Sequence, residues 1–223
     1  MSALAHCGQR AALAALFSFF VLIPSTGLAQ TAKPAKPAAS AARPNVKVDD
    51  RWVYRRTDKR MKPPILVYEL RVSFVDARAI HTVVERQGGR RESDATWTPE
   101  WNGVVQVDEG VIELEQGMLQ FPLSPGKQYP AAWEIRRPRA GAFHVRHERK
   151  VTVVGWEDIE VPAGKFRALK VQADGHFRRI DKLASDEARN TYWYVPQVKR
   201  WVKHVYQDAR LEVTEELYFY RVQ

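Results

Sequence analysis

Apolar and polar residues alternate with a period of two along most of the chain after residue 48. The clearest segment is ILVYELRVSF, residues 65–74, in which one face is entirely apolar and the other face carries Glu69, Arg71 and Ser73. This alternation is typical of a strand with one buried face. Extended to the other segments, it predicts a core that includes Trp52, Tyr54, Leu66, Tyr68, Leu70, Val72, Phe74, Phe166, Leu169, Val171, Trp193 and Trp201.

Turn signals rich in glycine and proline separate these segments. Gly88-Gly89, Asp108-Glu109-Gly110 and Pro162-Ala163-Gly164 each stand between two alternating runs, as expected for hairpins. No segment after residue 49 has the period of a long amphipathic helix, and residues 181–189 are expected to form a loop or one short helix. The pattern predicts an all-β fold: a curved antiparallel sheet or half-barrel of about ten to eleven strands with few short helices.

The first 29 residues have the layout of a secretory signal peptide. Arg10 precedes the apolar run 11–23, and Gly27 and Ala29 place small residues before a cleavage point at Gln30. We expect residues 1–29 to be a signal peptide, residues 30–48 a disordered Pro/Ala/Lys-rich linker and residues 49–223 a single β domain. The mature protein is expected to be periplasmic or secreted, without a transmembrane helix, because the apolar run is too short to span a bilayer comfortably.

The net charge is concentrated ahead of the predicted domain. The chain has 35 Lys and Arg and 26 Asp and Glu, which gives a formal net charge of +9. Five of the basic residues and none of the acidic ones precede residue 49, so an excess of only four positive charges belongs to the predicted domain. Nucleic-acid binding needs a concentrated basic surface, and we therefore expect no nucleic-acid partner.

The stretch TYWYVPQVKRWVKHVYQD, residues 191–208, interleaves aromatic and basic residues, a composition that fits either a nucleic-acid stacking platform or two neighbouring strands of a sheet. A stacking platform for single strands gathers its aromatic rings on one open face. Here Pro196-Gln197 predicts a turn between two strands, and alternation places aromatic residues on both faces, with Trp201 beside Lys203. The predicted cross-strand partners of Lys199, Arg200 and Lys203 are Glu212, Glu215 and Glu216.

Two motifs, EVPAGKFRALKV at 160–171 and YWYVPQVKRWVK at 192–203, resemble in this order those of a large group of exported bacterial proteins that share a domain of unknown function. The resemblance covers residues 50–223 and extends to RWVYR and FPLSPGKQY. It implies an architecture similar to the LolA/LolB-like periplasmic lipoprotein carriers, which are antiparallel half-barrels around a hydrophobic cavity under a short helical lid. This sequence departs from that architecture, because no segment has the pattern of the lid helices.

The segment HVRHE, residues 144–148, contains two histidines, but residues three apart on a strand face opposite sides, and we expect no metal site there. His147 and Arg149 instead share a face with apolar neighbours. They are expected to form a polar handle for a ligand carboxylate or phosphate, or to be turned away by a β-bulge. The predicted ligand-binding residues are Trp133, Phe143, His147, Arg149, Trp193 and Trp201.

The sequence contains no nucleophile elbow and no phosphate-binding glycine loop, and we expect no catalytic residues, no cofactor and no enzyme activity. The leading hypothesis is non-catalytic binding of a lipid or another apolar or amphipathic envelope ligand on the concave face of the sheet. One alternative is a protein–protein interaction module, accessory to an envelope or surface assembly, for which we expect a filled interior. A second alternative is a hydrolase with an unrecognised site.

Overall fold

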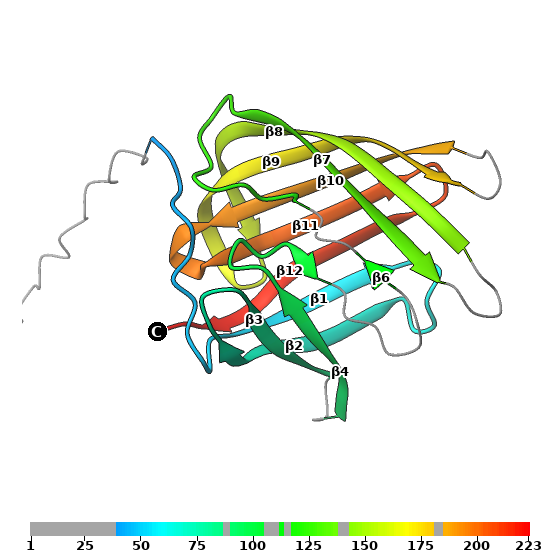
Figure 1. The fold of residues 1–223 in the computed structure, drawn as a ribbon. Helices are drawn as coiled ribbons and strands as arrows, with labels where there is room; N and C mark the ends of the chain where they lie inside the picture. The colour runs from blue at the N-terminus through cyan, green and yellow to red at the C-terminus, as the bar shows by residue number, and fades with distance from the viewer. Residues whose placement is uncertain (1–38, 87–89, 105–111, 114–116, 138–142, 181–184) are drawn as a thin grey trace, which may run out of the picture. The chain divides into compact units, whose positions relative to one another are not determined.

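The computed structural model describes residues 39–86, 90–104, 112–113, 117–137, 143–180 and 185–223, all within one packed unit, Pro37–Gln223. Twelve strands in these ranges form one antiparallel sheet in the order β5-β4-β3-β2-β1-β12-β11-β10-β9-β8-β7-β6 (Figure 1). The strands are β1 (Arg51–Asp58), β2 (Ile65–Val75), β3 (Ile80–Arg86), β4 (Arg90–Trp97), β5 (Gly103–Val104), β6 (Ile112–Glu113), β7 (Gln128–Arg137), β8 (Phe143–Val161), β9 (Gly164–Arg179), β10 (Ser185–Val195), β11 (Arg200–Asp208) and β12 (Glu212–Arg221). The predicted all-β fold with a curved antiparallel sheet is confirmed.

The sheet curves so strongly that strands distant in its order meet across its concave face. Trp97 at the end of β4 and Trp201 on β11 are separated by five strand-to-strand steps, which is about 24 Å in a flat sheet. Their ring centroids nevertheless lie 6.2 Å apart. The arching of β7 and β8 in Figure 1 shows the same curvature at the other end of the sheet.

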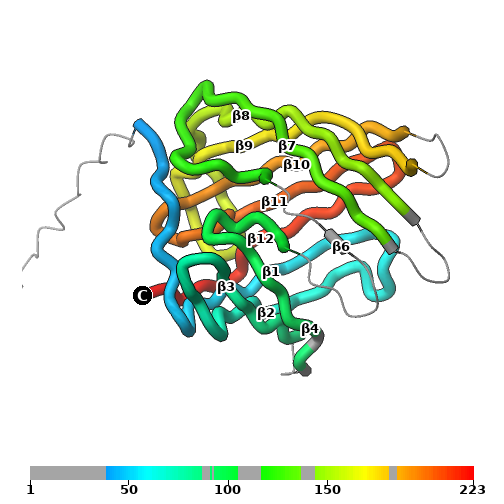
Figure 2. The backbone as a smooth tube through the Cα atoms, viewed as in Figure 1, coloured from blue at the N-terminus to red at the C-terminus, as the bar shows by residue number. Residues whose placement is uncertain are grey.

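Pairing of β1 with β12 joins the first and last strands of the domain in the middle of the sheet. Figure 2 shows the C-terminal end beside the segment that leads into β1. The fully buried Asp50 ties these two parts of the chain together. Its Oδ1 accepts a hydrogen bond of 2.8 Å from the Gln223 backbone N–H, and its Oδ2 accepts one of 3.0 Å from Lys199 Nζ. This contact also gives Lys199 a different partner from the predicted glutamates of β12.

The end of the predicted linker belongs to the packed unit, so disorder over all of residues 30–48 is wrong. The Ala41 N–H donates to the Leu123 carbonyl at 2.8 Å, and the Leu123 N–H donates back at 2.9 Å. Ala41 and Val46 are both buried. The predicted signal peptide and residues 30–38 lie outside the described residues.

The predicted turns at Pro162–Gly164 and at Pro196-Gln197 are confirmed. Gly164 pairs with Val161 at the end of the β8–β9 hairpin and has a φ of +128°, a backbone conformation that favours glycine. Pro196 begins the short 3-10 helix η1 (Pro196–Val198), which joins β10 to β11.

Two other predicted hairpins fall at the limits of the described chain. The hairpin predicted at Gly88-Gly89 joins β3 and β4, which pair with Arg86 opposite Arg90, although the two glycines themselves lie outside the described residues. The turn predicted at Asp108–Gly110 also lies outside the described residues. Residues 185–189 begin strand β10, so the expected loop or short helix is wrong for that part of 181–189.

A β-bulge changes the predicted faces of β11. Trp193 pairs with Lys203 but Tyr194 pairs with Trp201, so β11 contains one more residue than β10 at this point. The expectation that Trp201 shares a face with Lys203 is therefore wrong. Trp201 is buried in the core, whereas Lys203 Nζ lies 5.8 Å from the ring centroid of the half-buried Trp193.

Most of the predicted core is buried or packs against the core. Leu66 is half-buried, and Phe74 is 54% exposed, so its assignment to the core is wrong. The register of β2 against β3 shifts between Val72 and Phe74, which turns Phe74 away from the face that Leu70 and Val72 share. In the part of the chain that the structure describes, no helix is long and apolar enough to cross a membrane.

We expect Leu70→Ala to lower the free energy of unfolding by about 2–5 kcal/mol, because the side chain is only 2% exposed and its loss leaves a cavity. Phe74→Ala on the same strand is the matched control. It removes one tilted ring contact with His81 and should cost no more than about 1 kcal/mol. Urea denaturation measures both values, and equal losses would contradict the assigned faces of β2.

Candidate functional site

A cavity of about 380 Å³ lies on the concave face of the sheet. Its walls come from β4, β7, β8, β10, β11 and β12 and from two segments that contribute Trp101, Met118 and Leu119. Tryptophan and tyrosine rings dominate these walls, and a few polar groups stand among them. The lining residues are Trp97, Trp101, Met118, Leu119, Trp133, Ile135, His147, Arg149, Asn190, Tyr192, Trp201, His204, Tyr206 and Glu215.

The buried Asn102 holds the segment with Met118 and Leu119 against the cavity. Its Nδ2 donates to the Leu119 carbonyl at 2.9 Å, and its Oδ1 accepts from the Leu119 N–H at 2.8 Å, so one amide side chain satisfies both backbone groups. The Tyr129 hydroxyl adds a hydrogen bond of 3.0 Å to the Met118 carbonyl. These buried bonds fix an apolar wall that contributes no strand to the sheet.

Behind one wall of the cavity, Arg200 is enclosed by aromatic rings. It is 2% exposed, and its Cζ lies 3.8 Å from the ring centroid of Trp201, 4.2 Å from that of Trp101 and 4.7 Å from that of Trp97. Burial lowers the pKa of Arg200, while the nearby Tyr54 raises it. Contact with the negative faces of several rings is a favourable interaction for a desolvated cation.

This environment corrects the prediction that Arg200 pairs with a glutamate of β12. Arg200 forms no ion pair within 4.0 Å in the described ranges, and its Nε and Nη1 atoms have no hydrogen-bond partner there. Of the three predicted pairs with β12, Lys203 with Glu216 is present, at 3.1 Å.

Glu215 lines the cavity and is held by its neighbours. Its Oε1 accepts from the Tyr68 hydroxyl at 3.1 Å, and its Oε2 lies 3.4 Å from His204 Nδ1. Burial alone raises the pKa of Glu215, but the hydrogen bond from His204 and the charges of His204 and Arg56 lower it below its usual value. The carboxylate is therefore ionised and internally satisfied at neutral pH.

At the other side of the cavity, Trp133, His147 and Arg149 form a second group. The rings of Trp133 and His147 stack with centroids 4.5 Å apart, and Arg149 Cζ lies 5.5 Å from the centroid of Trp133. Burial, followed by the charge of Arg149, lowers the pKa of His147 to about 4. His147 is therefore neutral at neutral pH and offers Nδ1 as an acceptor, 3.5 Å from Arg149 Nη2.

Arg149 is 4% exposed, and burial lowers its pKa. Its Nη1 donates to the backbone carbonyl of Glu148 at 2.9 Å and to that of His176. Its Nε has no hydrogen-bond partner among the described residues. Arg149 thus enters the cavity with one edge fixed by the backbone and without a carboxylate partner.

Gly175 makes room for this arrangement. It pairs directly with Arg149, and a Cβ atom at Gly175 would lie 2.1 Å from the Glu148 carbonyl oxygen. Such a contact is too short for any side chain. The close approach of β9 to β8 places the Glu148 and His176 carbonyls within reach of the same guanidinium.

The structure brings together four of the six predicted ligand-binding residues, namely Trp133, His147, Arg149 and Trp201. Trp193 lies away from them: its Nε1 donates to Glu157 Oε1 at 2.5 Å, and the cations of Lys170 and Lys203 face its ring. Phe143 begins β8, and its side chain is outside the described part of the structure.

The two histidines of HVRHE diverge as their spacing predicts. His144 Nε2 lies 2.9 Å from Glu134 Oε2, whereas His147 faces the cavity. The described residues contain no group of three metal-ligating side chains that could hold a metal ion.

Sequence reasoning missed Tyr192, His204 and Glu215 as cavity residues. A signal for Glu215 was present, because it alternates with the buried Val213 and Leu217 on β12 and therefore shares their inward face. His204 was obscured by the bulge in β11.

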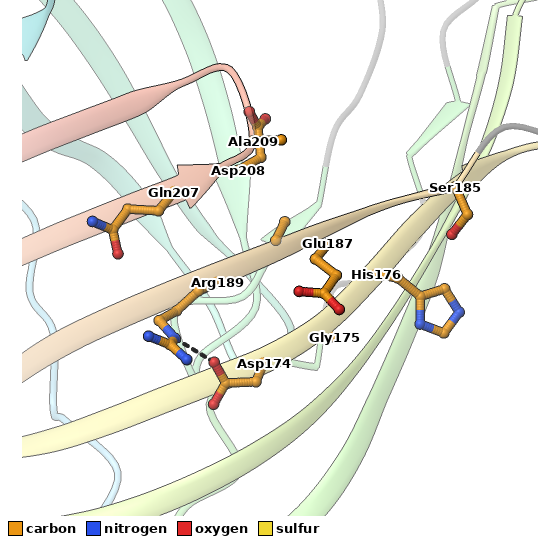
Figure 3. Close-up of a pocket in the computed structure, with 10 residues that line it drawn as sticks. Asp174, Gly175, His176, Ser185, Glu187, Arg189, Gln207, Asp208 and Ala209 are labelled. Atoms are coloured by element: carbon orange, nitrogen blue, oxygen red, sulfur yellow. Dashed lines mark hydrogen bonds and ion pairs between the residues drawn. The ribbon is translucent and has the colours of Figure 1, made fainter.

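A second, more open hollow of about 850 Å³ lies along β9, β10 and the end of β11 (Figure 3). Polar side chains dominate its lining, and Arg189 forms an ion pair with Asp174 inside it. Figure 3 shows His176 and Ser185 well apart from this pair. The hollow lacks the aromatic walls of the smaller cavity, which is therefore the better candidate for a binding site.

No known protein family and no curated protein matches the sequence. A Bacteroides fragilis protein, named as exported and as having a YmcC-like fold, is 12% identical over 81% of this chain and 99% of that chain, with a TM-score of 0.51. A Parabacteroides distasonis protein named as a lipoprotein is 15% identical over 81% of this chain and 99% of that chain, with a TM-score of 0.43. The hypothetical lipoprotein YmcC from Escherichia coli is 10% identical over 75% of this chain and 83% of that chain, with a TM-score of 0.40. The first likeness shows a shared fold.

We expect Arg200→Glu to abolish cooperative unfolding or to lower the free energy of unfolding by more than about 3 kcal/mol. The new carboxylate would be buried against the negative faces of the rings and near Glu215. Lys203→Glu is the control: it breaks the pair with Glu216 at a side chain that is 26% exposed and should cost about 1 kcal/mol. Thermal and urea unfolding followed by circular dichroism compare them, and similar losses would contradict the enclosed position of Arg200.

The pKa of His147 predicts a pH dependence of stability. The unfolded chain takes up a proton near the ordinary pKa of 6.5, whereas folded His147 does so only at about 4. The unfolded state therefore binds more protons between these values, and the free energy of unfolding falls as the pH is lowered through this window. His147→Gln should show a smaller fall in urea denaturation at pH 7, 6 and 5. Identical pH profiles of the two proteins would show that His147 is not desolvated.

Proposed function

We propose that the protein is a non-catalytic binding protein of the cell envelope that holds an apolar or amphipathic ligand in the cavity on the concave face. The observation that carries this proposal is the cavity itself, about 380 Å³ in volume and walled by Trp97, Trp101, Trp133, Tyr192 and Trp201. Ligand sites are typically concave, about 300–1,000 Å³ in size and mainly apolar, with a few placed polar groups. The cavity has each of these properties.

Export to the envelope is part of the same proposal. The signal-peptide layout of residues 1–29 supports it. The name of the Bacteroides fragilis protein that shares the fold, which describes an exported protein, supports it as well.

We extend the proposal to the architecture that the motifs imply, a half-barrel carrier with a covered cavity. In this extension the part of the lid is taken by Met118 and Leu119, which line the cavity on an irregular segment that Asn102 holds in place. In this proposal the cover is a loop fixed by hydrogen bonds, which accounts for the lack of lid helices in the sequence pattern.

A non-catalytic role fits the state of the titratable groups in the cavity. Glu215 is engaged by Tyr68 and His204, and His204 Nε2 lies 3.1 Å from Asn190 Oδ1. Both oxygens of Glu215 and both ring nitrogens of His204 are thus engaged within the protein. The open interior also favours ligand binding over the protein–protein module, for which we expected a filled core.

The test is binding of a neutral apolar fluorescent probe, 1-N-phenylnaphthylamine, to the full chain and to Ile135→Trp. Ile135 lines the cavity and is half-buried, so a larger side chain there fills space that the probe needs. We expect wild-type binding in the micromolar range and a loss of about tenfold or more in the variant. Val154→Trp, at a residue that is 51% exposed, is the control and should bind like the wild type. Absence of wild-type binding, or equal binding by both variants, would contradict the proposal.

A further inference from the structure

Arg149 determines what kind of ligand the cavity accepts. We propose that the ligand is a single-chain amphiphile with one anionic headgroup, a carboxylate or a phosphate, which sits against Arg149 while its chain lies among the aromatic rings. This inference rests on the proposed function and adds to it the charge and the size of the ligand.

The first support is an uncompensated buried cation. Arg149 is 4% exposed, and within the described ranges no carboxylate lies within 4.0 Å of its guanidinium. The acidic side chains of the neighbouring strands are already paired: Glu148 with Arg146 and His176, and Asp174 with Arg189. A buried arginine without such a partner is costly for the folded protein, and an anionic ligand supplies the missing charge.

The orientation of the guanidinium fits this role. Nη1 is occupied by the Glu148 and His176 carbonyls, which fix the plane of the group. Nη2 makes only a long contact of 3.5 Å with His147 Nδ1, and the enclosed Nε has no partner among the described residues. A carboxylate or phosphate oxygen that displaces the His147 contact gains a short, charge-assisted hydrogen bond from Nη2.

The charges around the cavity give a second and independent support. Arg149 lines the cavity, and Arg200 stands directly behind the rings of Trp97, Trp101 and Trp201. Glu215, the one carboxylate of the described lining, is held by Tyr68 and His204. Two buried cations against one satisfied carboxylate make the interior attractive to an anion and repulsive to a cation.

The volume limits the size of the apolar part. A methylene group is close in size to a water molecule. A cavity of about 380 Å³ therefore has room for about a dozen methylene groups. One alkyl chain of about that length therefore fits between the described walls. The aromatic lining further favours an amphiphile over a small free anion, which would leave the rings without a contact.

Four ligands of matched size test the inference on the full chain: dodecanoate, dodecyl phosphate, dodecanol and dodecyltrimethylammonium, each below its micellar concentration. Affinity is measured by isothermal titration calorimetry and by displacement of the neutral probe. We expect the wild type to bind the two anions about tenfold or more tighter than the alcohol and to bind the cation least. Acetate and inorganic phosphate, which carry the same charges without the chain, should not bind at millimolar concentration.

Arg149→Met removes the charge and keeps most of the volume. The variant should lose the preference for the anions, so that the ratio of their affinity to that of dodecanol falls to about one. Arg178→Met on β9 is the matched control, because this arginine is exposed, and the ratio should not change. Circular dichroism checks that each variant is folded, and the headgroup comparison on the wild type decides the question if Arg149→Met does not fold.

The possible outcomes separate the two proposals. If dodecanol and the anions bind the wild type equally, the headgroup inference is wrong and the apolar cavity stands. If the free anions bind as well as the amphiphiles, the site is an anion site without a role for the chain, and the inference is overturned. If the probe and all four amphiphiles fail to bind, the proposed function itself fails. A preference for anions that persists in a folded Arg149→Met protein would place the headgroup elsewhere.

Discussion

A guanidinium group among aromatic rings holds the curvature of this sheet. Arg200 on β11 contacts Trp52 and Tyr54 of β1, Trp97 of β4, Trp101 and its own neighbour Trp201. These residues come from strands that would lie far apart in a flat sheet, and they converge because each ring face is attracted to one buried positive charge. The indole N–H groups of Trp52 and Trp101 donate to the Val198 and Lys199 carbonyls at 2.8 Å, which fixes the rings around the chain that carries Arg200. Since Trp97, Trp101 and Trp201 also wall the cavity, the cation that bends the sheet also shapes the site.

The cavity persists because its lining is held from behind by polar contacts. Asn102 fixes the Met118–Leu119 segment, and Gly175 allows two backbone carbonyls to reach Arg149. Each contact satisfies groups that would otherwise be buried without a partner, so the segments cannot simply move inward to fill the space. The described walls are therefore held apart around a hollow interior, in contrast to a core whose side chains interlock.

Alternation was sufficient to predict the strands, because side-chain direction on a regular strand follows from parity alone. It placed His147 and Arg149 on the apolar face of a regular strand, but it could not decide between this direction and a β-bulge that turns them away. It failed where a strand gains a residue. The bulges beside Phe74 and at Trp201 reversed the expected faces, and no local pattern of residue types marks them. The environment of Arg200 was also beyond sequence reasoning, since its rings come from segments about 100 to 150 residues away. A charged residue is rarely fully buried, and the expectation of an exposed ion pair followed from that rule.

Three charges at the cavity, those of the half-buried Glu215 and of the buried Arg149 and Arg200, are compensated to different degrees. Glu215 has hydrogen-bond partners on both oxygens, and Arg200 has several ring faces. Arg149 has one ring, two carbonyls and a long contact to a neutral histidine. Its strand neighbours on the same face, Val151 and Val153, are fully buried and apolar, so stability alone would favour an apolar residue at this position too. An anionic ligand of the kind proposed would offset the remaining cost of burying Arg149. Its binding would then stabilise the folded state by mass action, so that under this proposal one arginine links the stability of the fold to the ligand.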